Sequence, residues 1–345
     1  MSDNQRRQSD PAQPRVNTQD LLGVTPAGVA DVFLGEPRDY GPLRIYGGHF
    51  LAQALAAAFG TVAENKLAHS LHAYFLRPGI PDWPIQYRVD RLREGGGYET
   101  RAVRATQQGN AVFFMSASFK GPEEGDAHQP TFTAMGGPAA AMARRVASGR
   151  ERVPLPFTLG TGVELEILDD WSPLNARLEE GGIQLWMRLA AHALHSSRLQ
   201  QCALAFLSDS TLLFNALRRH GQPFVTHRTT SLDHALWFHR LPDCGEWLFF
   251  DQTGPAAADG RGLNHGFIYA SDMFLQRLRH LARVLPARCA WQSEFHRGSS
   301  SLERFRRAQA TRKFSNCQGS DSSTRSSMSQ PRPSRGVQSV YTPPR

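Results

Sequence analysis

Two stretches in the second half of the chain carry the side chains best suited to hydrolysis. Asp209 interrupts the apolar run ALAFLSDSTLLF, and Ser231 directly precedes LDHALWFH. A carboxylate on a buried helix face is costly, and burial raises its pKa toward the range useful for a general base. Asp209 and Ser231 would then hold a water molecule between them. The alternative is structural: Ser208 or Asp209 caps the start of a helix, and Ser231 begins a strand.

Two glycines, Gly47 and Gly48, precede an apolar segment in the first half of the chain. Backbone N–H groups at a helix N-terminus can stabilise an oxyanion, and glycine lets a substrate approach the backbone closely. We therefore interpret this pair as a candidate oxyanion or substrate-binding element. A plain turn before the helix would place glycines there as well.

The sequence contains two similar segments that are each predicted to form a strand carrying histidine. HSLHAYFLRPG spans residues 69–79, and the less regular TSLDHALWFHRLP spans residues 230–242. His69 and His72 are candidates for substrate binding, although a strand histidine is more often a packed, hydrogen-bonded residue. The same alternative applies to His234. None of these spacings predicts a metal site.

Each half of the chain repeats one order of elements around these residues. An apolar helix is expected over residues 47–60, followed by alternating strands over 69–77, 84–93, 98–107 and 111–119. A second helix is expected over residues 198–219, and strands run from VELEIL to RGLNHGFIYAS. The pattern predicts an α+β double hotdog, in which two tandem antiparallel sheets each wrap around a long helix.

Composition shifts along the chain suggest its domain boundaries. We expect a disordered tail (1–20), an N-terminal hotdog domain (21–120), a surface linker (121–160), an incomplete C-terminal hotdog domain (161–275) and a basic low-complexity tail (276–345).

The last strand of the second hotdog is expected to be missing. Where the first half continues into AVFFMSASF, the second continues into MFLQRLRHLARVLPARCAW, which is dense in arginine and has no period of two. A reading-frame shift or an altered exon near Asp272 would produce such a change. The predicted consequence is an exposed sheet edge.

The motifs YGGHFLAQAL and HSLHAYFLRPG, with SDS and SLDHALWFHR, resemble those of the type II acyl-CoA thioesterases. The resemblance covers roughly residues 30 to 272. It implies a double hotdog that hydrolyses fatty acyl-CoA to free fatty acid and CoA, with Asp209 and Ser231 as catalytic residues. It also implies a Gln on the last strand, near Leu281, and no residue there convincingly fills that role; Gln276 lies in the wrong context.

CoA carries phosphates, so a basic contact is expected. Arg77, Arg101 and Arg104 are the candidates, with solvated strand arginines as the alternative. Water activated by a carboxylate needs no cofactor.

Composition narrows the remaining classes of function. The four cysteines are widely spaced, which favours a reducing compartment, and the polar N-terminus is not typical of a secretory signal. The longest apolar run is too short to span a membrane. We expect a cytoplasmic protein, with a peroxisomal location left open, and a homo-oligomer is also left open.

The net charge of +8 comes from the arginine-rich C-terminal segment, leaving the rest mildly acidic. That segment has no pattern of a nucleic-acid-binding domain, so we expect no nucleic-acid partner. The alternatives to an active thioesterase are a non-catalytic acyl-CoA-binding or vestigial hotdog protein and, less favoured, a hotdog dehydratase.

Overall fold

A computed structural model gives the arrangement of the chain. It describes residues 17–40, 45–129, 136–149, 155–169, 181–190, 194–221, 226–270 and 273–286, the last range as backbone only. All of these residues lie in one compact unit, Met1–Arg297. The predicted tail beyond residue 286 lies outside the described residues.

The first half is an antiparallel sheet packed against one apolar helix. Helix α2 (Gly47–Phe59) is buried over most of its surface, because alanines, leucines and phenylalanines occupy every face. The strands that follow are β3 (Leu67–Phe75), β4 (Ile85–Arg93), β5 (Tyr98–Gln107) and β6 (Asn110–Lys120). The short elements α1 (Thr18–Leu22), β1 (Thr25–Pro26) and β2 (Val32–Gly35) precede them. These bounds confirm the predicted helix and strands within two residues.

The second half repeats this order. Strands β7 (Val163–Ile167) and β8 (Gln184–Leu189) lead to helix α4 (Ser197–Ser208) and the 3₁₀ helix η3 (Leu212–Leu217). Strands β9 (His227–Phe238), β10 (Leu248–Ala258) and β11 (Arg261–Ala270) follow, as the alternation in the sequence predicts.

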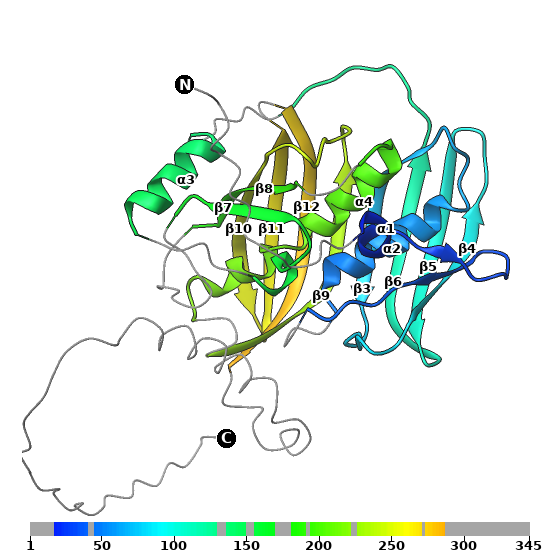
Figure 1. Cartoon of the computed structure of the whole chain (residues 1–345), viewed down its shortest axis with the longest axis horizontal. Coiled ribbons are helices and arrows are strands. Elements are labelled where there is room, and N and C mark those ends of the chain that lie inside the picture. The colour runs from blue at the N-terminus through cyan, green and yellow to red at the C-terminus, as the bar shows by residue number, and fades with distance from the viewer. Residues whose placement is uncertain are drawn as a thin grey trace, which may run out of the picture. The chain divides into compact units, whose positions relative to one another are not determined.

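The two halves join edge to edge into one twelve-stranded sheet, with the order β1-β2-β4-β5-β6-β3-β9-β12-β11-β10-β8-β7 (Figure 1). Strands β3 and β9 pair antiparallel at the centre, with Leu71 opposite Leu236. The order of strands reads almost the same outward from this junction in both directions. The sheet therefore has an approximate twofold symmetry that relates β3 to β9, β6 to β12 and β5 to β11.

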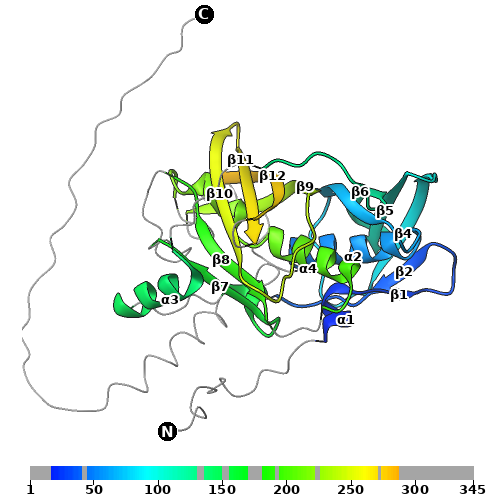
Figure 2. The same ribbon diagram turned by 90° about the horizontal axis from the view of Figure 1, so that it is seen from above.

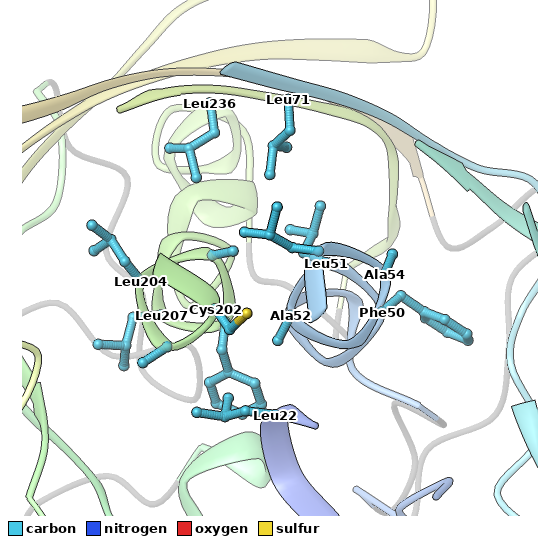
Figure 3. Packing of buried hydrophobic residues seen from close by; sticks show 14 of the residues in the cluster. Leu22, Phe50, Leu51, Ala52, Ala54, Leu71, Cys202, Leu204, Leu207 and Leu236 are labelled. Atoms are coloured by element: carbon cyan, nitrogen blue, oxygen red, sulfur yellow. The ribbon is translucent and has the colours of Figure 1, made fainter. Parts of the chain in front are cut away.

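Helices α2 and α4 lie side by side beneath the junction and run in opposite directions (Figures 1 and 2). Tyr46, before α2, donates a 2.9 Å hydrogen bond to the carbonyl of Phe206 near the end of α4. At the other end Arg198, at the start of α4, donates to the carbonyl of Phe59, the last residue of α2. Figure 3 shows Leu71 and Leu236 pointing from the joined strands onto this helix pair, which forms the centre of the core.

The expectation of a missing last strand is wrong for the backbone. Residues Met273–Pro286 form strand β12, which pairs antiparallel with both β11 and β9. A strand ladder is made by main-chain N–H and C=O groups, and a segment without an internal proline can supply them whatever its side-chain pattern. Without β12, the facing edges of β9 and β11 would each carry a row of unpaired backbone N–H and C=O groups.

The predicted linker 121–160 contains α3 (Pro138–Ala147) and a 3₁₀ turn, η2 (Pro156–Thr158). One further expectation needs correction. The helix expected over residues 198–219 is broken: α4 ends at Ser208, and η3 follows. The side chain of Asn215 in η3 accepts a hydrogen bond from Ile183 N–H and donates to Gln252, which fixes η3 as a separate element.

A buried ion cluster fixes the turn after α2. Arg101 is fully buried and donates to Glu99 at 2.8 Å and to the carbonyl of Thr61 at 2.8 Å. Lys66 contacts the other carboxylate oxygen of Glu99 at 2.8 Å. Burial pushes the pKa of Glu99 upward, but the hydrogen bond from Lys66 and the charges of Lys66 and Arg101 outweigh this and hold it below its usual value.

We expect Arg101→Met to lower the free energy of unfolding by about 3 kcal/mol, because removal of one partner leaves a buried carboxylate short of its countercharge. The matched control is Arg91→Met. Arg91 pairs with Asp31 at 2.9 Å, but its side chain is 43% exposed, so the expected loss is below about 1 kcal/mol. Urea unfolding measures both values. Equal losses in the two variants would contradict the structural role of the buried cluster.

Candidate active site

Asp209 is a buried carboxylate at the C-terminal end of helix α4. It is the C-cap residue, with φ −92° and ψ 4°, and its side chain is 5% exposed. The sequence suggested either a helix interior or a helix start, and the observed position is neither. The C-terminal end of a helix carries partial negative charge, so nothing in α4 itself stabilises an ionised carboxylate there.

The first turn of helix α2 faces this carboxylate. The backbone N–H of Gly48 donates to Asp209, and a side chain at Gly47 would collide with Oδ2 of Asp209. A side chain at Gly48 would collide with the carbonyl oxygen of Phe206. The two glycines are therefore required for the close approach of α2 to the end of α4, which a simple turn would not explain.

Burial dominates the ionisation of Asp209. Desolvation raises the pKa of its carboxyl from 3.8 to about 8, and the hydrogen bond from Gly48 opposes this only in part. A carboxyl group with such a pKa is a competent general base near neutral pH.

His234, on the buried face of β9, is the second titratable group at the site. Its Nδ1 lies 3.8 Å from Oδ1 of Asp209, and its Nε2 lies 3.0 Å from the hydroxyl of Ser208. Ser208 donates its one hydroxyl proton to the carbonyl of Ala205, so it accepts from Nε2–H of the imidazole. This tautomer directs the lone pair of Nδ1 toward Asp209, although 3.8 Å is too long for a direct hydrogen bond between the two groups.

Ser231 lies on the same strand as His234, and a β-bulge sets its orientation. Residues three apart in a regular strand face opposite sides of a sheet. The pairing of β9 with β12 skips Leu232, because Asp233 pairs with Leu281 and Ser231 pairs with Ala282. The extra residue brings Ser231 back to the face that carries His234.

The other candidates from the sequence are not brought to this place. His69 lines a cavity at the opposite end of the helix pair, and His72 is exposed and packs edge-on against Trp237 at 5.2 Å. Arg77 is exposed and donates to the carbonyl of Ala111 at the start of β6.

Of the remaining arginines, Arg104 is exposed on β5, as a CoA contact requires. Arg101 has no exposed surface, and its N–H groups donate to oxygen atoms of the protein. The prediction that Arg101 contacts CoA is therefore wrong. A solvated strand arginine and a buried one look alike in sequence because both follow the period of the strand.

His234 is the residue whose importance the sequence understates. Its only signal is its place in LDHALWFH, where alternation puts it on the buried face with Leu236 and Phe238. A polar residue on such a face needs a partner, and here that partner is on α4.

Within the described ranges, no group of three or more His, Cys, Asp and Glu side chains is placed to hold a metal ion. None of the helices that the structure describes has the length and apolar character needed to cross a membrane.

Several known proteins are similar to this chain in sequence and in fold. The family model described as acyl-CoA thioesterase matches residues 176–285, and the model of the acyl-CoA thioesterase N-terminal domain matches residues 36–120. Acyl-CoA thioesterase 2 of Haemophilus influenzae is 33% identical over 252 residues, which cover 70% of this chain and 87% of that protein. Human acyl-coenzyme A thioesterase 8 is 30% identical over 258 residues, covering 70% of this chain and 80% of that protein.

Solved structures agree with the double hotdog. An acyl-CoA thioesterase II from Mycobacterium marinum superposes with a TM-score of 0.65 at 30% identity and covers 78% of this chain and 98% of its own. A hot dog fold protein from Alicyclobacillus acidocaldarius, at 17% identity and a TM-score of 0.62, shows the fold alone. With two family models matched in order and a bacterial relative covered over most of its length, the chain belongs to the acyl-CoA thioesterase family.

Proposed function

We propose that this chain is an acyl-CoA thioesterase, which hydrolyses fatty acyl-CoA to free fatty acid and CoA. The observation that carries the proposal is the buried carboxylate of Asp209, held by Gly48 of one helix and facing Nδ1 of His234. The relatives are named as acyl-CoA thioesterases, which supplies the substrate class.

In the proposed reaction, Asp209 and Ser231 hold a water molecule on the inner face of β9. Asp209 takes a proton from this water as its oxygen attacks the thioester carbonyl, and the C–S bond then breaks. The leaving thiol has a pKa of about 8.5, so it needs little acid assistance. The proton then passes from Asp209 to the departing thiolate or to solvent, which returns the base to its ionised form.

The oxyanion needs donors that are not already in use. Gly48 N–H is committed to Asp209, so Gly47 N–H in the same helical turn is the remaining candidate of the pair. An exposed arginine such as Arg104 is proposed to contact the CoA phosphates.

The last strand sets the expected rate. The family resemblance implies a Gln there, but the positions that pair with Asp233 and Ser231 are Leu281 and Ala282. Neither supplies an amide, so we propose that turnover is slow. The same two residues favour the alternative function, that of a hotdog protein that binds acyl-CoA without hydrolysing it.

Release of free thiol from a medium-chain acyl-CoA series separates these functions. The proposed function predicts equimolar thiol and free fatty acid, above the uncatalysed rate and proportional to protein concentration. Saturable binding of the same acyl-CoA with no thiol release over hours would contradict it and support the non-catalytic function.

For the compartment, we propose the cytoplasm. The two described cysteines, Cys202 and Cys244, are free and buried, as a reducing compartment allows. The peroxisome is the alternative, because a yeast relative is named a peroxisomal acyl-coenzyme A thioester hydrolase.

A further inference from the structure

A cavity lies at the opposite end of the helix pair from Asp209. It has a volume of about 670 Å³, which is within the usual range for small-ligand sites. Five segments line it: the turn after α2, the start of β3, the end of β6, the start of α4 and the end of β9. Its lining includes His69, Lys120, Arg198, His239 and Arg240.

The approximate twofold symmetry relates this cavity to the site around Asp209. The C-cap of α4 is Asp209, and the C-cap of α2 is Gly60. Strands β3 and β9 each carry a bulge, and matching the two bulges places Ala68 where β9 has Ser231. The cavity therefore has no equivalent of the carboxylate of Asp209 or of the hydroxyl of Ser231, so it can hold a ligand but cannot activate water in the way proposed for the Asp209 site.

Positive charge replaces the missing carboxylate. The guanidinium of Arg198 donates to carbonyl oxygens at the end of α2, those of Phe59, Val62 and Ala63, which are neutral partners. The nearby carboxylate of Glu64 offsets part of its positive charge. Arg240 is exposed at the rim. The N-terminus of α4, at Ser197 and Arg198, adds the positive end of a twelve-residue helix to the same wall.

A polar atom without a partner also lies in the wall. Nε2 of His69 is buried and makes no hydrogen bond with any described residue. Two carboxylates, Glu64 and Glu123, line the rim, and Lys120 pairs with Glu123 at 2.7 Å. That pair is exposed and weak, so an incoming anion can compete for Lys120 at little cost.

We propose that this cavity binds the phosphate-bearing end of a nucleotide, without hydrolysis. The proposal rests on the proposed function only in naming CoA as a source of such a group. The cationic wall and the helix N-terminus would hold the phosphates, and His69 would contact the ligand within the cavity.

Calorimetric titration of the full chain with CoA tests the proposal. Adenosine 3′,5′-bisphosphate, inorganic phosphate and decanoate serve as further probes. We expect two CoA sites per chain, with the bisphosphate binding the second site more tightly than inorganic phosphate and decanoate not binding it. Binding of CoA at one site only, with an affinity that Arg240→Glu leaves unchanged, would overturn the proposal, and so would equal affinity for bisphosphate and phosphate.

Three charge reversals locate the second site. Arg240→Glu and Lys120→Glu are expected to weaken the second CoA site at least tenfold, because each places a negative charge at the cavity. Arg144→Glu, on the exposed face of α3, is the matched control and should keep both sites. An unchanged second site in both cavity variants overturns the proposal.

Thiol release from acyl-CoA, measured in the same variants, distinguishes this inference from the proposed function. Loss of the second site with unchanged hydrolysis assigns the cavity to binding alone. Two CoA sites in a chain that releases no thiol would support the cavity and contradict the proposed hydrolysis.

Discussion

Asp209→Asn lowers kcat/KM for acyl-CoA hydrolysis by about 10³-fold, with little change in KM. The amide has the shape of the carboxyl group but cannot take a proton from water, and general-base catalysis typically contributes 10²- to 10⁴-fold. The decrease should appear in kcat because the base acts on the transition state and not on substrate binding. Thiol release under saturating acyl-CoA measures both constants.

The same substitution also stabilises the folded protein relative to the wild type, by an amount that grows as the pH rises. The pKa of Asp209 is about 8 in the folded chain and about 3.9 in an unfolded one, so the folded state binds more protons between these values. Its carboxyl group therefore destabilises the fold progressively from about pH 4 to pH 8. We expect the Tm advantage of Asp209→Asn to grow over this window and to level off above it.

Asp90→Asn is the control for both effects. Asp90 is exposed on β4, so its replacement should change neither the activity nor the pH dependence of Tm. An Asp209→Asn variant that keeps more than a tenth of the wild-type activity would show that another group is the base. A Tm difference independent of pH would show that Asp209 is not held protonated by burial.

Ala282→Gln is expected to raise the rate of acyl-CoA hydrolysis by about tenfold or more. Ala282 pairs with Ser231 across the β9–β12 ladder, and paired residues in an antiparallel sheet share a face. A Gln at this position would therefore present an amide beside Ser231, where it can orient the attacking water or donate to the oxyanion. One oxyanion donor typically contributes about 10²- to 10³-fold, so an amide added at this position is expected to recover at least part of that range.

The neighbouring position supplies the matched control. Leu281 pairs with Asp233 and lies one residue away, so Leu281→Gln adds the same amide to the opposite face of the sheet. We expect no gain from it. An equal gain from both substitutions, or a gain from Leu281→Gln alone, would mean that the register of β12 at the site differs from the one described.

Much of the fold could be predicted because it follows from side-chain periodicity. Strands β3 to β6 alternate between the core and solvent, and a helix apolar on all faces, such as α2, must be buried. Strand β12 could not be predicted in this way, because its sequence lacks the period of two. Its place between β9 and β11 is set by backbone pairing with strands far away in the chain.

The candidate site was predictable in its residue types but not in its geometry. The polar interruption at Asp209 and the double glycine before α2 were visible in the sequence. Their proximity depends on the antiparallel packing of α2 and α4, which no local pattern encodes. The same packing places His69 at the far end of the helix pair and gives His234 its neighbour, so two similar histidine strands have different surroundings.

The pH dependence of kcat/KM for acyl-CoA hydrolysis tests the role of Asp209 as the base most directly. We expect a rate that rises tenfold per pH unit at low pH and reaches a plateau above about pH 8, since only the ionised carboxyl can accept the proton. A rate that is flat between pH 6 and pH 9, or that falls across this range, would contradict it.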